Sequence, residues 1–141
     1  MKLTITTGVV TIPIERDGEV TGALHFDPKD VAFAQGFYDL LSRFEQTITD
    51  FHAKSQALEK DDAAGYFALL REVTDSVRSG IDGLFGSGTA EAAFGPVSSP
   101  DVMGQFFDGL AAIVTQSREG SVSKYLPEPE EQTQQGEDGL V

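Results

Sequence analysis

Two long amphipathic segments joined by a short polar link restrict the fold of this 141-residue chain more than any other feature. Their apolar residues recur every three or four positions, which places them on one face of a helix. The first segment, broken only at Ser55, carries Phe37, Leu41, Phe44, Ile48, Phe51 and Leu58. The second carries Ala63, Tyr66, Leu70, Val73, Val77, Ile81 and Leu84. Because the link at residues 60–62 is short, the helices, about 28–60 and 62–85, are predicted to form an antiparallel hairpin.

The residues before the first helix alternate as two strands with one buried face do, which predicts a β-hairpin over about residues 8–26. A two-residue turn at Asp17-Gly18 would pair Ile14 with Thr21 and put the apolar side chains on opposite faces. We therefore favour a three-residue loop, 16–18, with Gly18 in the left-handed region, which pairs Ile14 with Val20 and Val10 with Leu24. Two further interpretations concern the flanking residues: Leu3 and Ile5 as an additional strand, and Asp27-Pro28 as the cap and first position of the long helix.

The glycine-rich stretch Ile81–Gly95 follows the second long helix. It resembles a phosphate-binding loop, but no Lys follows Gly88, and the residues before it are predicted to be a helix rather than a strand. We interpret it as a corner: Gly86 ends one helix with a left-handed cap, and Ser87 or Gly88 opens a short helix over 89–94 with Glu91 in its first turn. No ligand is expected there.

The last predicted helix covers residues 100–118, with Ser99 as its cap and Pro100 at its first position. It is expected to cover the helical hairpin. The fold class is thus α+β and mainly α: a β-hairpin, a long helical hairpin, a short helix and a C-terminal helix in one domain over residues 1–126. The last part, 127–141, is rich in Pro, Glu, Gln and Gly, and is predicted to be a disordered acidic tail.

The net charge of −13 argues against nucleic acid as a partner, because a phosphate backbone would be repelled. Five acids lie in residues 127–141, and without them the charge is still −8 (−13 + 5), so the folded part is itself acidic. The same charge leaves open a second role, imitation of a nucleic acid by an inhibitor. The chain has no cysteine, and no apolar run approaches the about 20 residues of a membrane span, so we expect no membrane association.

The sequence contains few candidates for catalytic or metal-binding residues. His25 and His52 have no second His or carboxylate at a metal-binding spacing, and no serine lies in a nucleophile motif. The sequence therefore predicts no catalytic residue, no metal and no cofactor, and the chain is not expected to be an enzyme.

Aromatic residues are the remaining signal, since the chain has ten Phe and no Trp. Most must form the core, yet not all of them can point along one narrow helix face. We select as candidate partner-binding residues, for an apolar helix or for self-association, Phe33, Phe37, Tyr38, Phe106 and Phe107.

The corner and the order of the predicted elements resemble the tail assembly chaperones of long-tailed bacteriophages. Those proteins carry a similar stretch after two long helices, matched here by Leu84, Phe85, Gly86, Gly88, Thr89, Ala90, Glu91, Phe94 and Gly95. This chain departs from the pattern at Ser98-Ser99-Pro100, where an Asn often follows the second Phe-Gly. The helix cap is kept, but the match is looser there.

The resemblance implies a function without catalytic residues. Such a chaperone binds the long helical tape measure protein in the cytoplasm of the infected host, keeps it in solution and brings tail tube subunits to it. It is expected to be absent from the mature virion. A structural tail or connector component of the virion remains a further alternative.

Overall fold

The computed structural model describes residues 1–125, of which 118–125 are described as backbone only. It contains a β-hairpin, β1 (Val10–Arg16) and β2 (Glu19–Phe26), followed by the helices α1 (Val31–Gln56), α2 (Ala63–Phe85), α3 (Thr89–Phe94) and α4 (Pro100–Tyr125). The predicted class, α+β and mainly α, is confirmed in this order of elements. The predicted tail at 127–141 lies outside the described residues.

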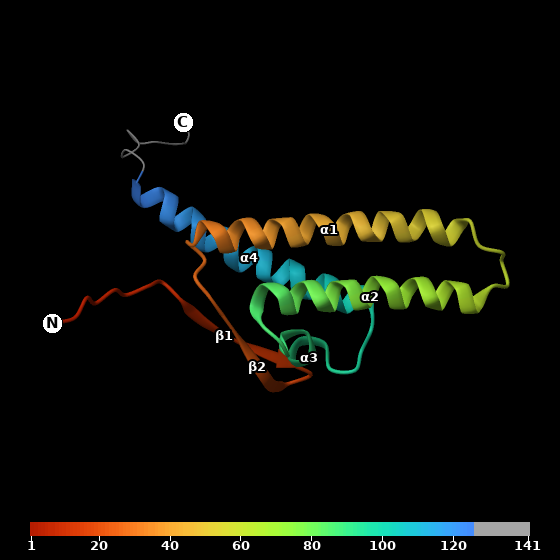
Figure 1. The fold of residues 1–141 in the computed structure, drawn as a ribbon, viewed down its shortest axis with the longest axis horizontal. Coiled ribbons are helices and arrows are strands. Elements are labelled where there is room, and N and C mark those ends of the chain that lie inside the picture. Colours follow the sequence, from red (N-terminus) through yellow and green to blue (C-terminus); the bar gives the residue numbers. More distant parts are fainter. Residues whose placement is uncertain (126–141) are drawn as a thin grey trace.

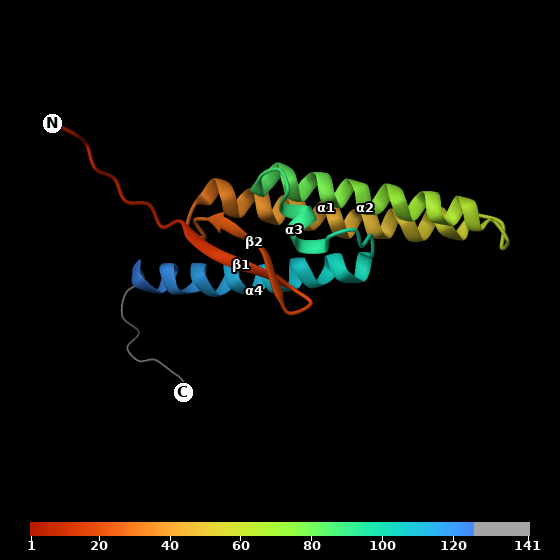
Figure 2. The same cartoon turned by 90° about the horizontal axis from the view of Figure 1, so that it is seen from below.

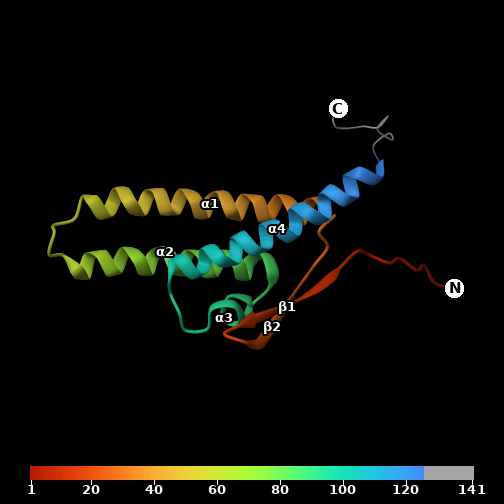
Figure 3. The same cartoon turned by 180° about the vertical axis from the view of Figure 1, so that it is seen from behind.

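The two long helices lie side by side and antiparallel, and α4 crosses behind them (Figures 1 and 3). The β-hairpin and α3 lie together beside one end of the helices, and the hairpin runs over α4 when viewed from below (Figure 2). All three views show the linked ends of α1 and α2 projecting beyond the start of α4. The molecule therefore has a layered end and a two-helix end.

The core sits at the layered end, where β2 and every helix contribute to it. Its buried residues are Leu24, Phe26, Phe37, Leu40, Val77, Ile81, Ala90, Phe94, Met103, Phe107, Leu110 and Val114. The helical periodicity in the sequence places these positions on the inner face of each helix, so burial of the apolar stripe stabilises the arrangement. The predicted covering role of the last helix is confirmed by Met103, Phe107 and Val114, which are completely or almost completely buried.

The predicted strand register is wrong. Asp17 and Gly18 form a two-residue turn in which both residues have positive φ (54° and 86°), as a hairpin turn favoured by the strand twist requires. Ile14 pairs with Gly22 and Val10 with Phe26, because the ladder shifts by one residue between Ile14 and Glu15.

Because of this irregularity, Thr21 has no partner residue on β1. Beyond it, Leu24 and Phe26 of β2 pair with Ile12 and Val10 of β1, so the apolar side chains of both strands lie on one face of the sheet. Val20 lies before the shift, and its side chain is exposed. Thr21 is held by α3 instead, because its hydroxyl donates to the Ala92 carbonyl at 2.5 Å. A contact with an element 71 residues away thus decides the register, and such a contact is invisible to local strand patterns.

Several helix bounds also differ from the prediction. α1 begins at Val31, since its cap is Asp30, whose carboxylate accepts from the Ala32 amide at 3.0 Å, and not Asp27. It ends at Gln56 rather than near residue 60. α4 continues past 118 to Tyr125, because the sequence has no proline before Pro127 to end it. Leu3 and Ile5 belong to no strand and are exposed.

Gly22 of β2 lies close against α3. A Cβ at this position would lie 2.7 Å from the Ala92 Cβ, a contact that only movement of backbone could relieve. We predict that Gly22→Ala lowers the free energy of unfolding by about 1–3 kcal/mol, the usual cost of overpacking. Gly83→Ala is the control: its Cβ would meet nothing within 4 Å, and alanine should raise helix stability by up to about 1 kcal/mol. Urea denaturation followed by circular dichroism measures both, and equal stability of the two variants would contradict the prediction.

Candidate functional site

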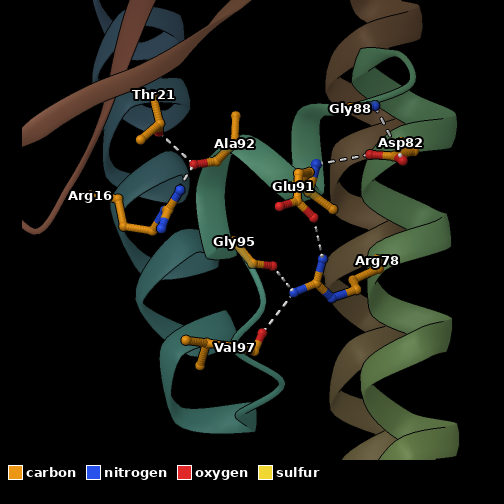
Figure 4. Close-up of polar contacts among 10 residues, drawn as sticks. Arg16, Thr21, Arg78, Asp82, Gly88, Glu91, Ala92, Gly95 and Val97 are labelled. Carbon is orange, nitrogen blue, oxygen red and sulfur yellow. Dashed lines mark hydrogen bonds and ion pairs between the residues drawn. The ribbon is translucent and has the colours of Figure 1, made fainter.

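The corner between α2 and α3 is held by the carboxylate of Asp82, which lies one turn before the end of α2. Its oxygens accept from the Ala90 amide at 2.8 Å and from the Gly88 amide at 3.4 Å (Figure 4). These are amides at the start of α3 that a phosphate-binding loop would offer to its ligand. Here they donate to a negative side chain from within the protein, so an incoming anion would meet both occupied donors and a like charge.

The glycines and Thr89 of the corner complete its backbone. Gly88 has φ +92° and opens α3, and Thr89 donates its hydroxyl to the Gly86 carbonyl at 2.8 Å. Gly86 also has a positive φ, but its ψ of 154° lies outside the left-handed helical region in which we predicted it. Glu91 lies in the first turn of α3, as predicted.

Arg78 of α2 ties down the far end of α3, which the sequence analysis missed. Its guanidinium donates to the carbonyls of Gly95 at 2.5 Å and Val97 at 2.7 Å (Figure 4). The same group lies 3.8 Å from a carboxylate oxygen of Glu91 and 5.7 Å from the centre of the Phe94 ring. The Arg78 guanidinium thus binds two carbonyls that follow the end of α3 and pairs with a carboxylate in the first turn of the same helix. No local motif signals this role, because the partners lie 17 and 19 residues away.

The predicted partner-binding aromatics do not form one exposed patch. Phe37 and Phe107 are buried in the core, which corrects their assignment to a surface. Phe33 and Phe106 are half-buried against that core. Tyr38 alone is exposed, at 42%, and its hydroxyl lies 3.3 Å from the Thr115 hydroxyl of α4.

Eight of the ten Phe form a continuous series of ring contacts through the layered end. Ring centres 4.7 to 6.5 Å apart link Phe26, Phe33, Phe37, Phe85, Phe94, Phe106, Phe107 and Phe44, through pairs in stacked and edge-on geometry. Phe85 and Phe94 of the corner belong to this series, so the signature residues anchor the corner in the core.

The other two Phe lie in the two-helix end, together with Tyr66. The Phe51 and Tyr66 rings are 5.5 Å apart and the Tyr66 and Phe67 rings 5.8 Å apart, with Phe67 64% exposed. Beside them, residues from the ends of α1 and α2 and the link line an open cleft of about 490 Å³. The sequence pattern placed Phe51 and Tyr66 in the apolar stripes, and could not show that α4 starts too late to cover this end of the hairpin (Figure 1).

A groove between α1 and α4 continues from this region toward the core. Its volume is about 430 Å³, and Phe44, Ile48 and Phe51 line its α1 side. Its α4 side contains Gly104, at which a Cβ would meet nothing within 4 Å, and two acids, Asp101 and Asp108. An apolar floor with acidic residues beside it suits a helix that has an apolar stripe and basic flanks. We call this surface the α1–α4 groove.

Neither a metal-binding cluster nor a membrane-spanning helix is present in the described part of the chain. Within residues 1–125, no three His, Cys, Asp or Glu side chains lie close enough together to hold a metal ion. His25 lies on the outer face of β2, where its Nδ1 is 3.0 Å from the Thr11 hydroxyl. No described helix is both long and apolar enough to cross a membrane.

Comparison with known proteins identifies a family. The model of a family described as "Family of unknown function (DUF6673)" matches residues 21–138, which is most of the chain. The chain belongs to this family. The match begins inside β2 and includes all four helices, and therefore both the corner and the α1–α4 groove. No curated protein and no solved structure matches the chain.

The Asp82 carboxylate should be required for the stability of the corner. We predict that Asp82→Ala lowers the free energy of unfolding by about 0.5–2 kcal/mol, as loss of a helix cap does, because the Gly88 and Ala90 amides lose their acceptor. Thermal unfolding followed by circular dichroism measures it. Ser87→Ala, at an exposed position of the same corner, should leave the transition unchanged. A melting curve of Asp82→Ala that overlays the wild type would contradict this role.

Gly86 provides a second test of the corner. Because its φ of +116° is one that a β-branched residue rarely adopts, Gly86→Val should cost about 1–3 kcal/mol of stability. A Cβ there meets nothing within 4 Å, so the loss comes from the backbone and not from crowding. Gly86→Asn should lose a similar amount, because a ψ of 154° places Gly86 outside the left-handed helical region that asparagine tolerates. Chemical denaturation ranks the three proteins, and a valine variant as stable as the wild type would refute this assignment.

Proposed function

We propose that this protein is a non-enzymatic chaperone of bacteriophage tail assembly. In this role it binds the helical tape measure protein in the cytoplasm of the infected host, keeps it in solution and helps to recruit tail tube subunits. It is absent from the mature virion. The resemblance of the corner, from Leu84 to Gly95, supports the choice of system.

The single observation that carries the binding role is the α1–α4 groove. Its floor residues Phe44, Ile48 and Phe51 are only half-buried in this chain, and its volume of about 430 Å³ accommodates several apolar side chains of a partner helix. A long helical client exposes such stripes until it assembles, and covering them reduces aggregation. The net charge of −13 keeps the chaperone and its complex apart from other copies by repulsion.

The groove also separates this proposal from its rivals. An inhibitor that imitates nucleic acid would bind through its charges, so its affinity would fall steeply with salt. Binding of an apolar helix in the groove depends chiefly on buried apolar area and should be much less sensitive. A connector or other structural tail component would be found in purified virions, whereas a chaperone would not.

Two glycines of α4 offer a matched test of the groove. Neither Gly104 nor Gly109 would meet any atom within 4 Å if it carried a Cβ, but only Gly104 lines the groove. We predict that Gly104→Gln places a longer side chain in the groove and weakens binding of the client at least about tenfold. Gly109→Gln should bind as the wild type does. Because glutamine is a better helix former than glycine, both variants should fold.

Coexpression with the tape measure protein of the same phage, followed by pull-down and assay of its soluble fraction, makes the measurement. A client equally insoluble with and without the wild-type protein would count against the proposed function. Equal capture by Gly104→Gln and Gly109→Gln would instead remove the groove from it.

A further inference from the structure

Four Asp-Gly dipeptides place a carboxyl group and a main-chain nitrogen that can react with each other at neighbouring positions of this chain. They are residues 17–18, 82–83, 108–109 and 138–139, the last of which lies outside the described residues. At such a dipeptide the nitrogen of the glycine can attack the Cγ of the aspartate, because glycine has no side chain to obstruct the approach. The product of the attack is a five-membered succinimide ring. Its formation requires rotation of the peptide group between the two residues.

Two of the described Asp-Gly dipeptides lie inside helices, which restrict that rotation. Residues 82–83 belong to α2 and residues 108–109 to α4. Their peptide groups take part in the helical ladder, in which each amide donates to the carbonyl four residues earlier. Rotation of either group therefore requires local opening of the helix first. The Asp82 carboxylate is held further, since its oxygens accept from the Gly88 and Ala90 amides.

The dipeptide Asp17-Gly18 forms the exposed turn between β1 and β2. Both residues have positive φ, 54° and 86°, which is the pattern of a type I′ turn. Asp17 is the only residue other than glycine with positive φ in the described chain. The strand ladder ends at the pair of Arg16 and Glu19, so the peptide group between Asp17 and Gly18 lies outside the ladder.

Rotation of this central peptide group brings the reacting atoms together. It converts the type I′ turn into type II′, in which the first central residue keeps its positive φ and has ψ of about −120°. At that ψ the Asp17 Cβ and the Gly18 nitrogen lie on the same side of the bond between the Asp17 Cα and carbonyl carbon, as they do in the succinimide ring. The turn can therefore reach the geometry of attack while Arg16 and Glu19 stay paired.

We propose that Asp17-Gly18 is a site of spontaneous covalent modification, at which Asp17 becomes isoaspartate. The Gly18 nitrogen forms a bond with the Asp17 Cγ, and the hydroxyl of the protonated carboxyl group leaves with the amide proton as one water molecule. Water then opens the ring. Its attack at Cγ restores aspartate, whereas its attack at the former main-chain carbonyl gives isoaspartate, in which the main chain runs through Cβ and Cγ. The reaction needs no reagent besides water.

The modification adds one carbon atom to the main chain of the turn. Because the length of a hairpin turn fixes the strand register, the longer turn no longer matches the pairing of β1 with β2 beside it. Arg16 and Thr21 lie next to the turn, and both donate to the Ala92 carbonyl of α3. Isoaspartate at position 17 therefore loosens the hairpin from α3. The two-helix end lies away from the hairpin and is not affected (Figure 1).

Ageing of the full chain at neutral pH and physiological temperature tests the proposal. Peptide mapping with electron-transfer fragmentation distinguishes isoaspartate from aspartate at each site, although their masses are equal. In the folded protein, isoaspartate should form at Asp17 at least about tenfold faster than at Asp82 and Asp108, which react only after local opening of a helix. In guanidinium chloride, where no helix protects them, the three sites should react at similar rates. Equal rates at the three sites of the folded protein, or no isoaspartate at Asp17 there, would overturn the proposal.

Asp17→Glu is the matched control for the effect on the hairpin, because it keeps the charge but cannot form isoaspartate. The modified fraction of the aged wild type, separated by chromatography, should exchange the amide hydrogens of β1 and β2 at least about tenfold faster than fresh protein. Exchange in the two-helix end should stay the same. Aged Asp17→Glu should exchange as its fresh form does. Unchanged exchange in the modified hairpin, or equal acceleration in aged Asp17→Glu, would contradict the loosening. The comparison of the three sites does not depend on this variant, and the turn shares no residue with the α1–α4 groove.

Discussion

The arrangement of this protein depends on a six-residue helix that is held from both sides. A helix as short as α3 is not stable by itself, because too few hydrogen bonds compensate for ordering its backbone. Asp82 and Arg78 of α2 hold its two ends, and Thr21 and Arg16 of the β-hairpin donate to the Ala92 carbonyl. α3 is therefore the piece through which the hairpin is attached to the helices. The Phe94 side chain, buried beneath it, adds an apolar anchor to these polar ones.

That attachment determines the path of the rest of the chain. Since α3 ends where Arg78 holds the Gly95 and Val97 carbonyls, α4 must start beside the middle of α2 and not at its first turn. The same start leaves the linked ends of α1 and α2 without a third helix. The α1–α4 groove thus results from the corner. The residues that give the corner its recognisable sequence act on the candidate binding surface only by positioning α4.

The sequence allowed prediction of what depends on local periodicity. The helical hairpin, the short helix over Thr89–Phe94 and the cap at Ser99 all follow from spacing and from capping residues within a few positions. What it could not give depends on distant contacts. The strand register was wrong because the Thr21 hydroxyl bonds to α3, and the start of α1 was wrong because the Asp27 carboxylate binds the Gly8 amide.

For the candidate binding residues, too, local spacing was predictable from the sequence and coverage by distant elements was not. Periodicity identifies Phe37, Phe51 and Phe107 as members of apolar stripes, but it does not tell which part of a stripe another element covers. Phe107 of α4 is buried, and its ring stacks on that of Phe44 at 4.7 Å, whereas Phe51 lines the groove beside the start of α4. A stripe that is longer than its cover leaves apolar surface at the uncovered end. The aromatic contacts of this end of the hairpin are separate from the eight-Phe series, so a change in its side-chain packing need not disturb the core.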